Sequence, residues 1–437
     1  MPSVAGLVIL TTTLASAQQN LPESSAVLLR GGTIHTISGP VIENGSVLIR
    51  NGRIIGVGRN LSAPEGAAII ELRGQQVYPG MIDSASRMGL QKSGEHGPSD
   101  AEEIGRFNPQ LDPVKAVDPA DEFIPASRLN GVTSAMEMPE GELISGQLSL
   151  IHLDGSANDS MAVAASLAVH IRFPAIETTP IPPHESDDDD DEPTTAAGQE
   201  VVPYKQAKAA FEQKMAELNG FFEAARRYRS AKLAKAANLQ PDRRYEAMIP
   251  VLEGKEPMFV TAVREREIRD AIAFSDRQKI KIILADPYEA YKVLPLIKSH
   301  NISVVLGPTL SLPLNRDDPY DLSYTIPAAL YQAGIKFSIG TFSGKLVRNL
   351  PYQAAAAVPF GLPHDEAYKA VSLNAAEIFG LGKILGSIDE GKVADLIVTD
   401  GDPLEAMTQV KMVFINGKPA DLETRQKQLY EKYLARP

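Results

Sequence analysis

The chain has 437 residues, of which 43% are hydrophobic and 22% charged, and it carries a formal net charge of −12. This length is enough for a large core, either one big α/β barrel with an accessory domain or two to three ordinary domains. The acidic balance argues against a nucleic-acid partner because it repels phosphate backbones, and the absence of cysteine excludes disulfides, thiol nucleophiles and thiolate metal ligands.

The N-terminus has the pattern of a secretory signal peptide. Residues 4–14 are mostly apolar and too short to span a bilayer, and Ala15, Ser16 and Ala17 form a small-x-small cleavage site. No Lys or Arg precedes the apolar run, and the alternative interpretation is an apolar N-terminal strand. We expect residues 1–17 to be removed and the protein to be secreted or periplasmic. No other stretch is long and apolar enough to predict a membrane span.

Both ends of the remaining chain have β character. Residues 26–72 are rich in β-branched side chains, and the pair Asn51-Gly52 between two strand-like runs predicts a hairpin because both residues accept positive φ. The C-terminal part repeats this character in DLIVTDG and VKMVFINGK, which ends at Asn416-Gly417. We predict one small β-sandwich domain made from both ends and a terminal helix. These segments are residues 18–78, 384–420 and 421–437.

The middle of the chain, residues 79–383, predicts a barrel. Short apolar runs alternate there with helical stretches, which indicates a parallel sheet, and the length is normal for a (β/α)8 barrel. The expected strands are QVYPGMID, GVTSAMEMP, PMFVTAV, KIKIILAD, ISVVLGP and IKFSIGTF, with SLIHLDG and AVHIRFP as less clear candidates between Met138 and Pro174. The predicted fold class is therefore α/β, a (β/α)8 TIM-type barrel with a small β-sandwich domain.

An acidic insertion interrupts this pattern at residues 183–200. Five consecutive Asp flanked by prolines cannot pack a core, and free carboxylates in a row have no fixed geometry. We interpret the insertion as a solvated loop rather than a cation site. A long helix follows it, with one apolar face that core packing explains. That face consists of Phe211, Met215, Leu218, Phe222 and Ala225.

Three separated stretches resemble the amidohydrolase superfamily, in particular its imidazolonepropionase-like branch. They are NGRIIGVG with QVYPGMID, RNLPYQAAAAVPFGLPHDEAYKAVSLNAAEIFGLG, and GSIDEGKVADLIVTDGDPLE with VKMVFINGK. The resemblance implies metal-dependent hydrolysis of non-peptide C–N bonds, with one or two divalent cations at the C-terminal mouth of the barrel. The usual ligands are His-x-His after strand one, a carboxylated Lys or a Glu after strand four, single His residues after strands five and six, and an Asp after strand eight.

The ligand positions of this chain are substituted. Strand one offers Ala85 and Arg87, strand five has Thr261, strand six has Asp286, and strand eight has Phe342. The strand-four position cannot be placed. Zinc-like ions need imidazole and carboxylate donors, and among these positions only Asp286 could bind a cation. A cationic Arg87 would also repel a divalent ion.

The seven histidines do not restore the metal, because only His152 and His170 fall on expected barrel strands. For each of these two, a satisfied core histidine is the preferred interpretation over a ligand. We therefore predict no metal and no cofactor, although the resemblance implies zinc or another divalent metal. The residues expected to line the mouth are Asp83, Ser84, Ala85, Arg87, Thr261, Asp286, Thr341 and Phe342.

The leading hypothesis is an amidohydrolase homologue that has lost its metal centre and binds rather than hydrolyses. Its partner would be a small molecule at the mouth, or a catalytically intact paralogue in a hetero-oligomer. A homo-oligomer is a further alternative. One alternative is an active C–N hydrolase with a metal-free or non-standard site, in which Asp286 is the base and Arg87 the electrophile. The other alternative is that the chain is a purely structural subunit.

A specific contact follows from the two charged replacements. We predict that Arg87 reaches toward Asp286 where the metals would sit, directly or through one water, because Arg is long and bonds carboxylates bidentately. Phe342 beside this pair would exclude water. The alternatives are pairing with a nearer acid, Asp83 or Glu137, or an Arg87 that swings to solvent.

Overall fold

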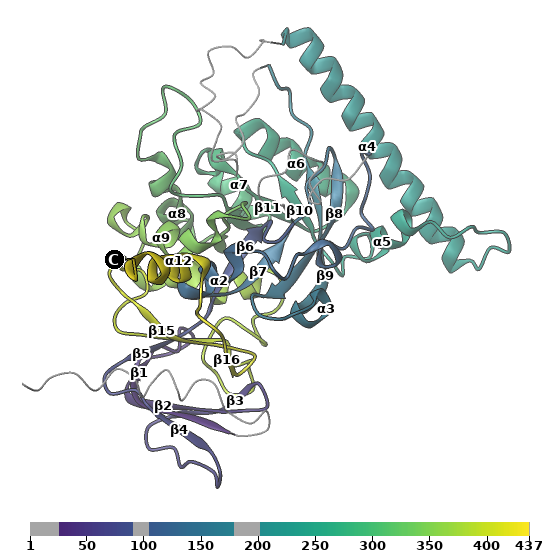
Figure 1. The fold of residues 1–437 in the computed structure, drawn as a ribbon. Coiled ribbons are helices and arrows are strands. Elements are labelled where there is room, and N and C mark those ends of the chain that lie inside the picture. Colours follow the sequence, from purple (N-terminus) through teal and green to yellow (C-terminus); the bar gives the residue numbers. More distant parts are fainter. Residues whose placement is uncertain (1–25, 91–104, 179–201, 437) are drawn as a thin grey trace, which may run out of the picture.

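The computed structural model describes residues 26–90, 105–178 and 202–436. The predicted signal peptide, residues 1–17, and the acidic insertion, 183–200, lie outside these ranges. Figure 1 shows a small sheet at one end of the molecule and a barrel with its surrounding helices at the other. The two predicted parts of the fold are therefore both present.

The small sheet combines strands from both ends of the chain. Its order is β16-β15-β14-β5-β1-β2-β3, and β4 pairs with β1 beside this path. Leu29, Val47, Leu396 and Phe414, from four of its strands, lie in one apolar cluster, so the sheet encloses a core of its own. The strands are β1 (Val27–Ile34), β2 (Ile42–Arg50), β3 (Arg53–Gly58), β4 (Ala68–Glu71), β5 (Gln76–Pro79), β14 (Leu396–Thr399), β15 (Val410–Ile415) and β16 (Lys418–Pro419).

The hairpin turn predicted at Asn51-Gly52 is confirmed, and the second Asn-Gly pair also forms a hairpin turn. Asn51 and Gly52 join β2 to β3 with φ values of 51° and 75°. Asn416 and Gly417 join β15 to β16 with φ values of 50° and 72°. Positive φ at both central residues matches the twist of the flanking strands, and Asn and Gly adopt it at little steric cost.

The barrel is an eight-stranded sheet in the order β13-β12-β11-β10-β9-β8-β7-β6. Its ends, β13 and β6, meet at the point of closure, so the barrel is nearly closed. The apolar runs expected as strands are confirmed as strands, except that QVYPGMID divides into β5 of the small sheet and the beginning of β6 of the barrel. They are β6 (Met81–Ser86), β7 (Val132–Glu137), β8 (Ile144–His152), β9 (Ala162–Arg172), β10 (Met258–Thr261), β11 (Ile282–Ala285), β12 (Ser303–Leu306) and β13 (Phe337–Ile339).

One strand departs from the expected parallel arrangement. β8 runs antiparallel to both β7 and β9, so the barrel is a mixed sheet. Only residues 138–143 join β7 to β8. A parallel pair needs a crossover of about a dozen or more residues, and a connection this short returns the chain antiparallel. The expectation of a fully parallel barrel was wrong at this position for that reason.

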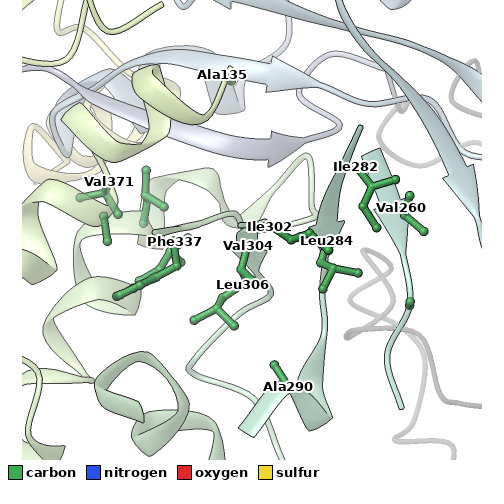
Figure 2. Packing of buried hydrophobic residues seen from close by; sticks show 14 of the residues in the cluster. Ala135, Val260, Ile282, Leu284, Ala290, Ile302, Val304, Leu306, Phe337 and Val371 are labelled. Carbon is green, nitrogen blue, oxygen red and sulfur yellow. The ribbon is translucent and has the colours of Figure 1, made fainter. Parts of the chain in front are cut away.

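Helices cover the outside of the barrel and pack on its apolar outer face. Figure 2 shows part of this packing, with Val260, Leu284 and Val304 on three neighbouring strands. The helices are α2 (Phe123–Leu129), α3 (Asn158–Met161), α4 (Tyr204–Leu233), α5 (Arg243–Leu252), α6 (Glu265–Gln278), α7 (Leu294–Ser299), α8 (Leu322–Gln332), α9 (Leu350–Ala355), α10 (His364–Ala370), α11 (Leu373–Ile378) and α12 (Arg425–Leu434). The short 3₁₀ turns are η1 (Pro113–Ala116), η2 (Tyr288–Lys292), η3 (Leu346–Asn349) and η4 (Val358–Phe360).

The long helix α4 runs along the outside of the molecule (Figure 1). Of its predicted apolar face, Leu218, Phe222 and Ala225 are buried, while Phe211 and Met215 are half-buried. The helical spacing of these residues therefore predicted the buried face correctly toward the middle of the helix. Among the described residues, no helix combines the length and the apolar character needed to cross a membrane.

The small sheet and the barrel are joined by a buried ion pair. His152, at the end of β8, lies with its Nε2 atom 2.9 Å from Oδ2 of Asp395, which directly precedes β14. The second oxygen of Asp395 accepts a hydrogen bond from the Asn416 N–H at 2.7 Å. Burial alone lowers the pKa of His152, but the charge and hydrogen bond of Asp395 outweigh burial and raise it overall. His152 is thus a satisfied core histidine.

Candidate functional site

The candidate site is the mouth of the barrel, where β6 and β10 to β13 end. Asp83 on β6 is completely buried and accepts three hydrogen bonds there. Its Oδ1 accepts from the N–H groups of Ala85 at 3.1 Å and Thr341 at 3.0 Å, and its Oδ2 accepts from the Thr341 hydroxyl at 2.5 Å. Burial raises the pKa of Asp83 to about 7, although the hydrogen bonds from Thr341 and Ala85 oppose the rise. Asp83 therefore holds β6 to the segment that follows β13.

Two of the substituted ligand positions fill the axis of the barrel with hydrocarbon. The Phe342 N–H donates to the Ala85 carbonyl at 2.7 Å, and both side chains are buried. The Phe342 ring lies 6.5 Å from the Phe259 ring with an interplanar angle of 17°. The apolar cluster around them includes Ile82, Met136, Met138, Leu148, Leu150, Ile283, Ala285 and Val305. This packing leaves hydrocarbon where the resemblance predicted imidazole and carboxylate groups.

Arg87 is bound at the rim of the mouth. Its Nη1 atom lies 3.1 Å from Oε2 of Glu140, and its Nε donates to the Phe342 carbonyl at 3.1 Å. The side chain is 12% exposed. Glu140 is none of the acids considered from the sequence. Asp286 is also nearly buried and has a φ of 51°, and its N–H donates to the Val305 carbonyl. The Arg87–Asp286 contact stays a prediction.

A second buried carboxyl group, Glu137, ends β7. It is completely buried, and within the described chain neither of its oxygens has a hydrogen-bond partner in good geometry. The Ser86 hydroxyl and the Met88 N–H lie near it, but the Met88 N–H donates to the Ser86 oxygen at 2.9 Å. Burial, and then the nearby Asp83 charge, raise the pKa of Glu137 well above its usual range. Burial therefore favours the neutral form of the Glu137 carboxyl group.

Thr261 bonds a histidine on the neighbouring strand. The His170 ring is buried, with Nδ1 2.9 Å from the Pro139 carbonyl and Nε2 2.9 Å from the Thr261 hydroxyl. The carbonyl can only accept, so Nδ1 carries the proton and Nε2 accepts from Thr261. Burial lowers the pKa of His170 to about 4, which keeps the ring neutral at physiological pH. Ser84 is also buried, and its hydroxyl has no partner in the described part of the chain.

The structure thus brings most of the predicted mouth residues together in three groups. Asp83 lies with Thr341, while Ala85, Phe342 and Arg87 form a second group. Thr261 belongs with His170 rather than with these. Glu140 was not predicted as the partner of Arg87, and its only sequence signal is a Pro-Glu pair just after a strand.

The comparisons with known proteins agree with this fold. An amidohydrolase family model matches residues 274–420. "Amidohydrolase tasK" of Hapsidospora irregularis is 37% identical over 65 residues, which are 15% of this chain and 7% of that protein. Imidazolonepropionase of Thermoplasma volcanium is 36% identical over 85 residues, which are 18% of this chain and 21% of that protein. The matched stretches are therefore a minor part of both curated relatives.

A solved structure agrees over nearly the full chain. The crystal structure of an amidohydrolase from Thermotoga maritima superimposes with a TM-score of 0.75 and 24% identity, over 90% of this chain and 99% of that one. The fold is thus a TIM-type barrel with an accessory sheet made from both ends of the chain. The family model shows similarity to amidohydrolases over residues 274–420, and the solved structure shows the likeness in fold.

The residues at the mouth do not fit the divalent cations that the resemblance to amidohydrolases implies. Asp286 is the one carboxylate at the substituted positions, and Arg87 places a positive charge among them. Both ring nitrogens of His170 and both carboxyl oxygens of Asp83 already form hydrogen bonds within the protein. Among the described residues, no group of three or more His, Asp and Glu side chains is arranged to hold a metal ion.

Proposed function

We propose that this chain is an amidohydrolase-superfamily protein that has lost the metal centre of its relatives and acts by binding. The observation that supports the proposal is the mouth itself. Ala85 and Phe342 lie in an apolar cluster at positions where the resemblance predicts ligands, and Arg87 bonds Glu140 and a backbone carbonyl. Such a mouth can hold the ends of β6 and β13 in place, but it does not generate a metal-bound hydroxide.

The metal-free hydrolase has less support from the same residues. An electrophile must offer its N–H groups to a developing oxyanion, and the Arg87 guanidinium donates to the Phe342 carbonyl and pairs with Glu140. The buried carboxyl groups of Asp83 and Glu137 have raised pKa values, as general acids often do, but both are completely enclosed. A substrate would have to displace packed strand ends to reach them.

We predict that protein purified without chelators contains far less than one transition-metal ion per chain. Chelation and added zinc should both leave the melting temperature unchanged, because an ion bound to the folded state would raise it by mass action. Elemental analysis and thermal unfolding with and without EDTA measure these quantities. A stoichiometric metal, together with hydrolysis of a cyclic amide or dipeptide that chelation abolishes, would overturn the proposal.

The binding partner and the compartment are further parts of the proposal. The proposed partner is a small molecule that binds at the mouth side of the barrel. The alternative is that the chain assembles with itself or with an intact paralogue, which light scattering on the purified protein tests.

The proposed export rests on the Ala15-Ser16-Ala17 pattern. N-terminal sequencing of protein from its native host should find a start near Gln18, and a retained Met1 would contradict export.

A further inference from the structure

A cavity of about 160 Å³ lies on the mouth side of the molecule, away from the barrel axis. One wall is the segment that follows β9, which includes Ile176. A second wall is the beginning of α4, and the third is the beginning of α6 with Arg264. Because β9 and β10 both end at the mouth, a molecule in this cavity would sit beside the plugged axis rather than in it.

The polar side of the cavity contains one cation that lacks a carboxylate partner. Arg264 donates from Nη1 to the Asn315 side-chain oxygen at 3.1 Å. Burial raises the pKa of Glu267 and the charge of Arg264 opposes that rise, but the Glu267 carboxylate accepts from backbone N–H groups and not from the guanidinium. The other charges of the cavity are engaged. Arg266 lies 3.7 Å from Asp270 across one helical turn, and Glu267 accepts from the backbone N–H groups of Val263 and of Arg264 itself. Arg264 is half-buried, so its remaining N–H groups are partly desolvated.

Two of the three walls of the cavity are largely apolar. Tyr204 and Phe211 are seven residues apart on α4, so they lie on the same side of that helix two turns apart, and Ile176 belongs to the wall that follows β9. Tyr204 is 56% exposed, which is high for an aromatic side chain, and Phe211 is only half-buried. A ligand that covered these rings would remove apolar surface from water.

We propose that this cavity binds a small amphipathic monocarboxylate, with the carboxylate on Arg264 and an apolar body against Phe211, Tyr204 and Ile176. A guanidinium donates two parallel hydrogen bonds to a carboxylate, which gives orientation as well as affinity. The inference rests on the proposed binding function and gives it a location and a ligand class. It can fail independently of that function, since the metal content of the protein does not depend on this cavity.

The test uses 4-phenylbutyrate and its uncharged isostere 4-phenylbutyramide as probes, with isothermal titration calorimetry on the wild-type chain. We expect the carboxylate to bind about tenfold or more tightly than the amide, the effect of one charge-assisted bidentate contact. Arg264→Gln should abolish this preference, and Arg264→Lys should retain part of it. Phe211→Ala should weaken both probes, because each loses the same apolar contact.

The control variant is Arg227→Gln, since Arg227 lies on α4 with a side chain 73% exposed and does not line the cavity. It should bind both probes as the wild type does. Equal affinity of the wild type for the two probes would overturn the proposal even if a variant failed to fold. The same holds if the preference survives in Arg264→Gln, or if neither probe binds saturably at millimolar concentration.

Discussion

Replacing Asp83 by alanine is expected to lower the free energy of unfolding by about 3–5 kcal/mol, because it leaves buried donors without a partner. The carboxyl group accepts from the Ala85 N–H, the Thr341 N–H and the Thr341 hydroxyl, and the two bonds from Thr341 join segments 258 residues apart. Urea unfolding followed by circular dichroism measures the change. The matched control is Asp317→Ala, on an exposed loop, which should stay within about 0.5 kcal/mol of the wild type.

The same residue predicts a pH dependence. The pKa of Asp83 is raised to about 7 in the folded protein, so between its ordinary value and pH 7 the folded state binds more protons than the unfolded state. This group's contribution to stability is therefore full at low pH and is lost as the pH rises through about 7. The wild type should exceed Asp83→Asn in unfolding free energy by more at pH 5 than at pH 8. An equal difference at both pH values would contradict the raised pKa.

Gly340→Ala is expected to destabilise the protein by about 1–3 kcal/mol, the usual cost of forcing extra volume into a packed core. A β-carbon at this position would lie 2.8 Å from the Ala85 nitrogen and 2.9 Å from the Ala85 β-carbon. The first of these is a backbone atom of β6, which cannot turn aside as a flexible side chain could. The close approach of β13 to β6 therefore depends on glycine.

The same substitution in α4 serves as the control and should have the opposite sign. A β-carbon at Gly220 meets no heavy atom within 4 Å, so Gly220→Ala is expected to stabilise the protein by about 0.5–1 kcal/mol through helix propensity alone. Urea unfolding of both variants gives the comparison. If Gly340→Ala were neutral while Gly220→Ala stabilised, the strands at the mouth would have to be free to separate.

Local patterns in the sequence determined much of the architecture. The pair Asn51-Gly52 specified its hairpin because positive φ is a property of those residue types, whatever surrounds them. The apolar runs became strands, and the helical stripe around Phe222 became the buried face of α4, since periodicity places side chains on one side of an element. The three motif stretches also indicated the superfamily resemblance, because they occur in the expected order along the chain. That resemblance in turn predicted the fold class.

The tertiary structure alone decided three features. The direction of β8 depends on the length of its connection to β7, and that length is known only once the structure gives the ends of both strands. Arg87 pairs with Glu140 because the loop after β7 brings that carboxylate to the rim, and charge type does not predict proximity. The cavity beside Arg264 joins walls from three distant segments, none of which carries a motif. In the last two cases the contact depends on how elements far apart in the chain pack together, and no local pattern encodes that packing.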